Sequence, residues 1–173
     1  MDNDENWVRK LFYLNEYEIS KRYKYLGEGI SRKVFAIDDN YVIKIAKNRN
    51  GYYQNKVEQF IYTNVNDQLR KYLCPIILFT SKCIIMRRAV PLPEIIKDKS
   101  IDIKKIRSEI TAWRDLNYLA RKYYLYYSDV VKISSWGKLE DNYVLIDYGC
   151  TSKEGDFYYG MYFLFSDFLK VFK

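Results

Sequence analysis

The apolar and polar positions divide the chain into a strand-rich first half and a helix-rich second half. Short apolar runs bounded by turn residues are typical of β-strands. Five such runs occur, at residues 23–26, 34–37, 41–46, 76–79 and 83–86. Between the second and third run, the polar stretch Asp38-Asp39-Asn40 is a strong hairpin signal. We therefore expect five antiparallel strands.

Apolar residues recur at helical spacing in four further segments, at residues 4–14, 51–65, 103–127 and 158–172. The third segment should carry one apolar stripe, formed by Ile106, Ile110, Trp113, Leu116, Leu119 and Ala120. We expect the first helix to pack behind the sheet. The last helix, which is rich in aromatic residues, should close the second half of the fold or present an apolar face to a partner or a second copy.

Composition limits the class of protein. The chain has 173 residues and is 49% hydrophobic, which suits one domain with a substantial core. No apolar run is long enough to span a bilayer, and the acidic, polar start MDNDENWVRK is unlike a secretory signal. Three cysteines without CxxC spacing suggest reduced thiols in a cytoplasmic protein, and we expect no membrane partner.

The absence of histidine excludes several mechanisms. The sequence contains no His at all, so it has no Ser-His-Asp or Cys-His catalytic group and no zinc site of the usual Cys/His type. The net charge of +7 suits an anionic partner such as a nucleotide, a nucleic acid or an acidic protein face, although solubility alone explains it equally well.

Candidate chemistry begins in residues 25–47. Gly27 and Gly29 lie two apart in a loop where open backbone geometry lets a ligand approach bare amides. Lys44 is the one charge within the apolar third run. A charge in that position must be paired or directed toward a ligand, because burying an unpaired ammonium is costly.

Glycine loop, hairpin and lysine strand together resemble the nucleotide-covering half of the protein kinase fold, in which a GxGxxGxV loop covers the ATP phosphates and a strand lysine binds them. Gly27, Gly29 and Val34 match this loop, and Lys44 matches the lysine. Arg32 replaces the third glycine, where it adds bulk or contacts phosphate. The resemblance implies ATP as the bound cofactor.

Two more parts of the pattern follow along the chain. Glu58, on the predicted helix 14 residues after Lys44, is in the place of the glutamate that pairs with that lysine; an exposed helix glutamate is the alternative. Residues 87–93 are in the place of the hinge, where the backbone of Arg87 and Ala89 would bind adenine. Met86 would lie beside the adenine, or serve only as a core residue.

The second half supplies two aspartates. Asp147, followed by Tyr148-Gly149 at a strand end, resembles the DFG motif whose carboxylate holds Mg²⁺. Asp129, 18 residues upstream, is similar in place to the catalytic aspartate that accepts the proton of the attacking hydroxyl.

The catalytic loop departs from the family at several positions. The asparagine that binds the second metal corresponds to Ser134, or to Ser135 if the loop has gained a residue. The usual lysine is Val131, although the neighbouring Lys132 could approach the transferred phosphate. These departures put catalysis in question.

The resemblance, which covers roughly residues 23–151, implies an α+β, two-lobed kinase-like fold. We expect an N-terminal helical extension at 1–22, an N-lobe at 23–90 and a truncated C-lobe at 91–173. The implied function is a minimal, atypical protein kinase that transfers the γ-phosphate of MgATP to a protein hydroxyl, including its own. A pseudokinase acting as a nucleotide- and protein-binding module is the main alternative. A small-molecule phosphotransferase and a basic nucleic-acid binder are weaker ones, since a nucleic-acid function leaves the ordered Lys44, Glu58, Asp129 and Asp147 unexplained.

Overall fold

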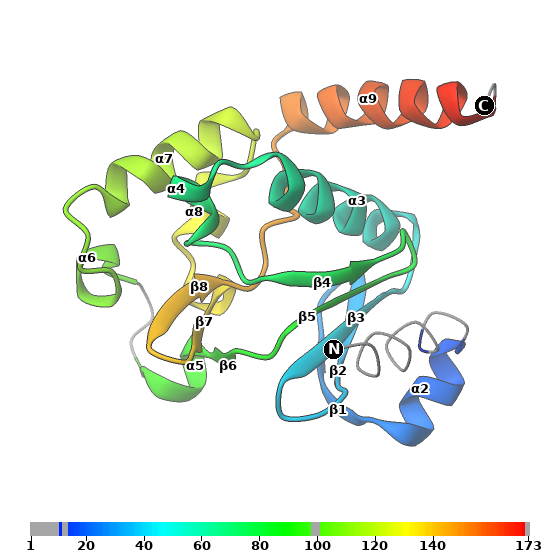
Figure 1. Ribbon diagram of the computed structural model, residues 1–173, viewed down its shortest axis with the longest axis horizontal. Coiled ribbons are helices and arrows are strands. Elements are labelled where there is room, and N and C mark those ends of the chain that lie inside the picture. The colour runs from blue at the N-terminus through cyan, green and yellow to red at the C-terminus, as the bar shows by residue number, and fades with distance from the viewer. Residues whose placement is uncertain (1–10, 12–13, 98–100, 172–173) are drawn as a thin grey trace.

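A computed structural model describes residue 11, residues 14–97 and residues 101–171. Its described part is an α+β structure, with a five-stranded antiparallel sheet beside a smaller, mainly helical region (Figure 1). This confirms the expected fold class and is consistent with a reduced, two-lobed kinase-like arrangement. The expected boundary between residues 90 and 91 stays a prediction.

All five predicted strands are present. They are β1 (Lys24–Glu28), β2 (Arg32–Ala36), β3 (Tyr41–Ala46), β4 (Ile76–Phe79) and β5 (Cys83–Arg87). Their spatial order is β1-β2-β3-β5-β4, and each neighbouring pair is antiparallel. Asp38 accepts hydrogen bonds from the amides of Asn40 and Tyr41 and so forms the expected turn between β2 and β3.

The two faces of the sheet carry different side chains and pack against different helices, because side chains alternate along each strand. Ile43 and Ile45 point to one face, where they join a buried cluster with Ile19 of helix α2 (Glu16–Arg22). Lys44 points to the opposite face, which is covered by helix α3 (Arg49–Asn64). One charged residue in an apolar strand is thus directed away from the first core cluster.

The predicted N-terminal helix is not tested by the described residues. Most of the predicted helix at residues 4–14 lies outside the described residues. The helix that is described, α2, begins after the capping residue Asn15, whose side chain accepts a hydrogen bond from the Glu18 amide. Its buried residue Ile19 packs against the sheet.

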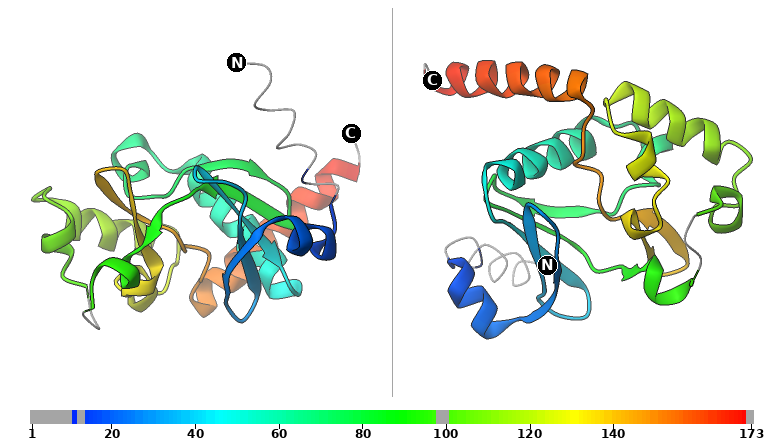
Figure 2. Two further views of the ribbon diagram at one scale, coloured as in Figure 1. Left: turned by 90° about the horizontal axis from the view of Figure 1, so that it is seen from below. Right: turned by 180° about the vertical axis from the view of Figure 1, so that it is seen from behind.

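The remaining elements form the helical region and its connections to the sheet (Figure 2). They are α4 (Asp67–Arg70), β6 (Val90–Pro91), α5 (Leu92–Ile95), α6 (Ile103–Ile106), α7 (Ala112–Lys122), α8 (Tyr127–Val130), the 3-10 turn η1 (Ile133–Ser135), β7 (Trp136–Leu139) and β8 (Asn142–Leu145). Strands β6, β7 and β8 form a second, three-stranded sheet.

The single long helix expected at residues 103–127 is wrong. Arg107 ends α6 in an extended conformation, because its guanidinium donates to the Tyr143 carbonyl at 2.7 Å and to the Glu109 carboxylate. Ile110 and Trp113, which we expected on the buried stripe, are therefore exposed. The other four residues of that stripe are buried.

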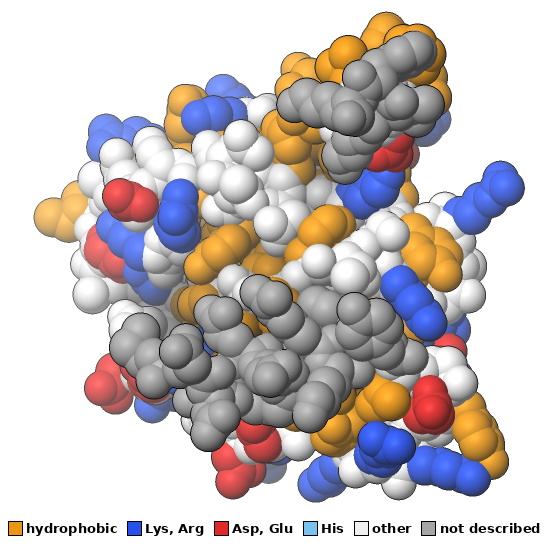
Figure 3. All heavy atoms as spheres, turned by 45° about the vertical axis from the view of Figure 1, so that its right-hand side comes forward, with side chains coloured by type: hydrophobic (Ala, Val, Ile, Leu, Met, Phe, Trp, Pro, Cys, Tyr) orange, Lys and Arg blue, Asp and Glu red, His pale blue; other side chains and the backbone are white. Residues whose placement is uncertain are grey.

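The C-terminal helix α9 (Lys153–Val171) lies along α3 instead of only closing the helical region (Figure 1). Its first half contacts α7, where the Tyr159 hydroxyl donates to the Tyr123 carbonyl at 3.2 Å. Its inner face packs on Phe60 of α3, and Lys56 of α3 forms an ion pair with Asp167 at 2.7 Å. Hydrophobic side chains gather on the projecting helix at the upper right of Figure 3.

None of the described helices is long and apolar enough to cross a membrane.

Two glycines in helices, one in close contact and one in open space, test how closely α3 approaches the sheet. A Cβ atom at Gly51, near the start of α3, would lie 2.3 Å from the Ser31 carbonyl oxygen and 2.9 Å from the Ala46 Cα. A Cβ at Gly160, in α9, meets nothing within 4 Å.

Gly51→Ala should therefore lower the free energy of unfolding by about 1–3 kcal/mol through overpacking. Gly160→Ala should raise it by about 0.5–1 kcal/mol through helix propensity. Urea unfolding of both variants measures the difference, and effects of equal sign would contradict the close approach of α3 to the loop after β1.

Candidate functional site

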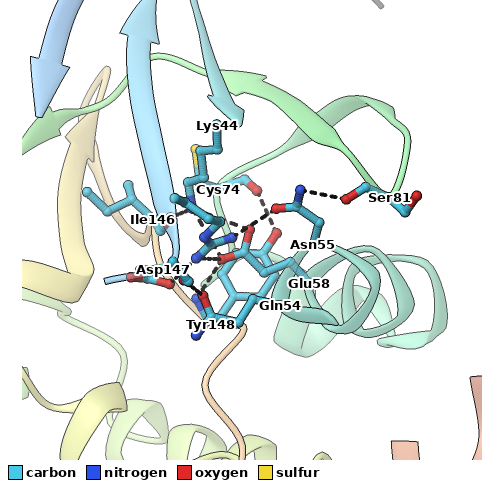
Figure 4. A network of polar contacts seen from close by, with 11 residues as sticks. Lys44, Gln54, Asn55, Glu58, Cys74, Ser81, Ile146, Asp147 and Tyr148 are labelled. Atoms are coloured by element: carbon cyan, nitrogen blue, oxygen red, sulfur yellow. Dashed lines mark hydrogen bonds and ion pairs between the residues drawn. The ribbon is translucent and has the colours of Figure 1, made fainter. Parts of the chain in front are cut away.

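Lys44 and Glu58 meet beneath the sheet. Lys44 on β3 and Glu58 on α3 are both buried, and the Lys44 Nζ lies 3.2 Å from Glu58 Oε1 and 3.3 Å from Oε2. The same ammonium donates to the Ile146 carbonyl oxygen at 2.5 Å. The structure thus brings the strand lysine, the helix glutamate and the segment before Asp147 to one place (Figure 4).

Arg32 enters the same cluster. It begins β2, is only 5% exposed, and its Nη2 donates to Glu58 Oε1 at 3.0 Å and to Asp147 Oδ1 at 2.6 Å. Its Nη1 lies 3.4 Å from Asn55 Oδ1. The residue that replaces the third glycine therefore points into the cluster and adds no bulk to the loop surface, and its expected contact with phosphate stays a prediction. It is a buried cation that links α3 to Asp147.

The segment after Asp147 is fixed to Glu58 as well. The Tyr148 amide donates to Glu58 Oε1 at 3.2 Å, and its hydroxyl donates to the Cys74 carbonyl at 3.1 Å. Burial raises the pKa of Tyr148 well above its ordinary value. The fully buried Glu58 carboxylate therefore has three partners, from β2, β3 and residue 148.

Charge sets the protonation of the Arg32–Asp147 pair. The Asp147 side chain is 55% exposed, but its surroundings still remove water from the carboxylate, which alone would raise its pKa. The positive charges of Arg32 and Lys44 outweigh this and lower the pKa to about 2. Burial alone would likewise lower the pKa of Arg32, and the Glu58 and Asp147 carboxylates reverse this and raise it. Both groups are charged at neutral pH.

A cavity of about 340 Å³ lies next to this cluster, under β1–β3 and the segment after β5. Val34, Val42, Met86 and Ile146 give it apolar walls, and Gly27 lies on its loop side. Gly27 has φ +155°, a backbone conformation that side chains rarely adopt, at a bulge in β1. The cluster reaches this cavity through Ile146, which lines it and whose carbonyl oxygen accepts from Lys44; the side chains of Arg32, Lys44, Glu58 and Asp147 do not line it. A larger hollow of about 630 Å³ lies between Tyr124 and α9.

The expected hinge borders the cavity. Arg87 and Ala89 both line it, and their binding of adenine stays a prediction. The backbone amides of Arg87 and Arg88 already donate to Pro75 and Asn40, at 3.0 and 2.7 Å. Within the described part of the chain, the Ala89 amide has no such acceptor and is the donor that the hinge can offer.

Asp129 lies outside the ion-pair cluster. It is half-buried in α8. After burial, its carboxylate is the main cause that raises the pKa of the Cys150 thiol to about 12, and the charge of Asp147 contributes. Both aspartates thus act on one neighbouring side chain, three residues after Asp147. The raised pKa makes Cys150 a poor nucleophile.

Lys132 and Ser134 do not join the cluster. Both are exposed in the turn after α8, and neither side chain forms a hydrogen bond or ion pair with Asp147. Ser135 is buried, and its carbonyl oxygen accepts hydrogen bonds from the amides of Ile146 and Asp147, at 2.8 and 3.4 Å. The Ser135 carbonyl therefore helps to fix the backbone of Asp147. Whether Ser134 or Ser135 stands at the second metal-ligand position stays a prediction.

The residues present do not fit the expected magnesium site in this arrangement. Mg²⁺ requires near-octahedral oxygen ligands. Asp147 Oδ1 is held by Arg32, and Glu58 is occupied by its three partners. Within residues 14–97 and 101–171, no group of three or more Asp, Glu, His or Cys side chains could hold a metal ion.

Three residues of the site escaped the sequence prediction. Ser31 donates to Gln54 at 2.5 Å, and Asn55 donates to the Ser81 carbonyl at 3.0 Å, so that its own carbonyl oxygen faces Arg32. Ser31-Arg32 and Gln54-Asn55 are each adjacent polar pairs. The signal that could have found them is that Gln54 and Asn55 lie one helical turn before Glu58.

Comparison with known proteins adds little about the site. No known protein family matches the chain, and no curated protein matches it. Among solved structures, one similar chain is that of the streptomycin–ATP–APH(2″)-IIa ternary complex. It is 18% identical, with a TM-score of 0.34, over 63% of this chain and 33% of that chain. This chain thus spans about a third of the length of that protein, and a likeness at this level does not decide what the site does.

The Arg32–Asp147 pair should make stability depend on pH. The pKa of Asp147 is lowered to about 2 in the folded protein, against about 3.9 for an ordinary aspartate. The unfolded chain therefore binds the proton more readily, so the stabilisation is complete above pH about 4 and is lost as the pH falls toward about 2. Urea unfolding of wild type and Asp147→Asn should show a stability difference that shrinks over this range. A difference independent of pH would contradict the pairing.

Glu58 should tolerate the loss of one cation but not of two. Lys44→Met leaves Arg32 and the Tyr148 amide on the carboxylate, so the fold should persist. Lys44→Met with Arg32→Met leaves a buried carboxylate without a cation, which costs about 3–5 kcal/mol for pairs of this kind. Denaturant unfolding should show that the double variant loses more than the sum of the single variants. Adding Glu58→Gln should recover part of that loss, and simple additivity would contradict the shared role.

Proposed function

We propose that this chain is a kinase-like domain that binds ATP in the cavity beside the Lys44–Glu58 pair. The observation that supports this most directly is that pair itself: a buried ammonium, held by a carboxylate, that also donates to the carbonyl of Ile146, a residue lining a cavity of about 340 Å³ with apolar walls. Small-ligand sites are typically concave, mostly apolar and furnished with a few placed polar groups. The cavity has this character.

The lining residues suit the parts of an adenine nucleotide. Val34, Val42 and Ile146 offer apolar surface to a base, and the Ala89 amide offers a hydrogen-bond donor. The Glu94 carboxylate, which the sequence did not single out, can accept hydrogen bonds from ribose hydroxyls. The phosphates would then extend past Gly27 toward Lys44.

Of the two activities open to such a domain, the arrangement favours a nucleotide- and protein-binding module, the pseudokinase alternative. Phosphoryl transfer depends on charges aimed at the transferred group. Here Asp147 is paired with Arg32, and neither Lys132 nor Ser134 forms a bond to it. On this proposal the domain acts by binding a protein partner, and nucleotide occupancy controls how firmly the sheet and the helical region are joined.

Transfer of the γ-phosphate to a protein hydroxyl is the second candidate. It is favoured by the nearness of Asp129 and Asp147 to one another, since both carboxylates raise the pKa of the Cys150 thiol. In that case Asp129 would accept the proton of the attacking hydroxyl, and Lys44 would hold the phosphates.

ATP should bind the wild-type protein and raise its melting temperature, because a ligand that binds only the folded state stabilises it. Lys44→Met should weaken binding at least about tenfold, the equivalent of one charge-assisted hydrogen bond. Lys82→Met, at an exposed turn between β4 and β5, is the matched control and should bind as wild type. Calorimetric titration measures all three, and equal affinities for the two variants would overturn the proposed site.

Incubation with ATP labelled at the γ-phosphate separates the two activities. A binding module should give no label on itself or on added acceptor proteins, although it binds ATP. Label that appears with wild type and is lost in both Lys44→Met and Asp129→Asn would establish transfer and reject the module.

A further inference from the structure

The outer face of helix α9 is apolar and exposed. At 3.6 residues per turn, it lies opposite Tyr159 and Phe163, which pack inward on the core. Eight of its side chains are each 40–74% exposed: Phe157, Tyr158, Met161, Tyr162, Leu164, Phe165, Phe168 and Leu169. Figure 3 shows hydrophobic side chains gathered on this helix. A contiguous apolar surface of this kind marks an interaction site.

The area of this face matches what a stable dimer buries. Covering an aromatic side chain completely removes about 150–250 Å² from water. Because roughly half of each of the eight side chains is exposed, together they offer about 800 Å² on one molecule. A standard protein–protein interface also buries about 800 Å² on each partner. The face of α9 is therefore large enough to hold two copies of the chain together.

Four side chains on this face have the spacing of a helix pair. Phe157, Met161, Leu164 and Phe168 follow one another at intervals of four, three and four residues. This is the heptad pattern through which two helices pack against each other. The pattern reads the same in both directions. An antiparallel second copy would therefore place Phe157 against Phe168, and Met161 against Leu164.

The two halves of α9 also complement each other in shape. The hollow of about 630 Å³ beside Tyr124 runs along the first half of the helix, where Phe157 and Met161 line it. In an antiparallel pair, the second half of each helix lies over the first half of the other. Its exposed side chains can then fill the partner's hollow: Leu164, Phe165, Phe168 and Leu169. A contact of this kind is isologous and closes at two copies.

The distribution of charge favours a second copy over other occupants. Asp167 is the one charged residue between positions 157 and 169, and it pairs with Lys56 of α3 at 2.7 Å. The outer face thus has no charge with which to attract an acidic or basic partner. A helix that binds a membrane surface is rich in Lys and Arg beside its apolar face. The first turn of α9 instead carries two carboxylates, Glu154 and Asp156.

We propose that this chain forms a two-fold symmetric homodimer in which the outer faces of two α9 helices pack antiparallel. Gly160 suits this contact because it lies beside the four-residue stripe and a Cβ there would meet nothing within 4 Å, so a second backbone can come close. The dimer goes beyond the proposed ATP site and does not depend on it, since no residue of α9 lines the cavity of about 340 Å³.

The test is sedimentation velocity of the full chain without nucleotide, at concentrations from about 1 to about 100 µM. Wild type should approach twice the mass of one chain as the concentration rises. Leu164→Glu would bury a carboxylate from each copy in an apolar contact, so the dissociation constant should rise at least about tenfold. Ile110→Glu, at a fully exposed apolar residue outside α9, is the matched control and should dimerise as wild type does.

A second variant tests the antiparallel arrangement. Met161→Lys alone should weaken the dimer as Leu164→Glu does. The double variant Met161→Lys with Leu164→Glu should recover at least about tenfold of the loss, because each lysine then faces the glutamate of the other copy. A parallel pair would place like charges together and recover nothing. All three substitutions are at exposed positions, and circular dichroism checks that each variant is folded.

Each contrary result has a definite meaning. A wild type that stays monomeric over the whole range would overturn the dimer. A dimer that Leu164→Glu leaves intact would place the contact elsewhere on the molecule and overturn the role of α9. A monomer that co-sediments with phosphatidylglycerol vesicles, and loses this binding in Leu164→Glu, would assign the face to a membrane surface and overturn the proposal. Loss of the dimer without recovery in the double variant would overturn the antiparallel arrangement.

Discussion

The fully buried carboxylate of Glu58 is the constraint on which the rest of the site depends. An ionised carboxylate out of water must be paired and hydrogen-bonded, or its pKa rises and it takes up a proton. Glu58 meets this demand with Lys44 from β3, Arg32 from β2 and the amide of Tyr148. These partners are far apart in sequence and belong to the sheet and to the segment that leads to α9. Satisfying one buried charge thus fixes α3, the sheet and residues 146–148 relative to one another, and sets the inner wall of the cavity.

Arg32 changes what such a cluster can do. A glycine at its position would remove the cation that holds Asp147 Oδ1 at 2.6 Å. With the arginine in place, its charge and that of Lys44 lower the pKa of Asp147 to about 2. The result is a site that is organised before any ligand arrives, which favours binding because little ordering remains to be done. The same fixed pairing works against catalysis, since charges already satisfied by each other stabilise a developing charge less well.

Much of the fold followed from local pattern, and the failures have a common physical cause. Strands and α3 were predictable because apolar alternation and helical period report which face is buried, and Lys44 and Glu58 stood out as charges on such faces. The long helix at 103–127 failed because Arg107 gains more from the Tyr143 carbonyl and the Glu109 carboxylate than from continuing the helix. The pairing of Arg32 with Asp147 joins residues 115 apart in sequence. No local propensity encodes such a contact, and only the resemblance of the loop directed attention to position 32.

The C-terminal helix shows how the reduced second region can still support the site. Helix α9 packs its inner face on α3, through Tyr159 against Phe60 and Asp167 against Lys56, and its first half contacts α7. Glu58 lies on α3 near Phe60, so α9 supports the helix that carries the buried carboxylate from the side opposite the sheet. The chain obtains this support from one helix, whose outer face remains rich in exposed aromatic and aliphatic side chains. The packing of α9 on α3 therefore has two consequences: it supports the helix that carries Glu58, and it leaves the outer face of α9 exposed.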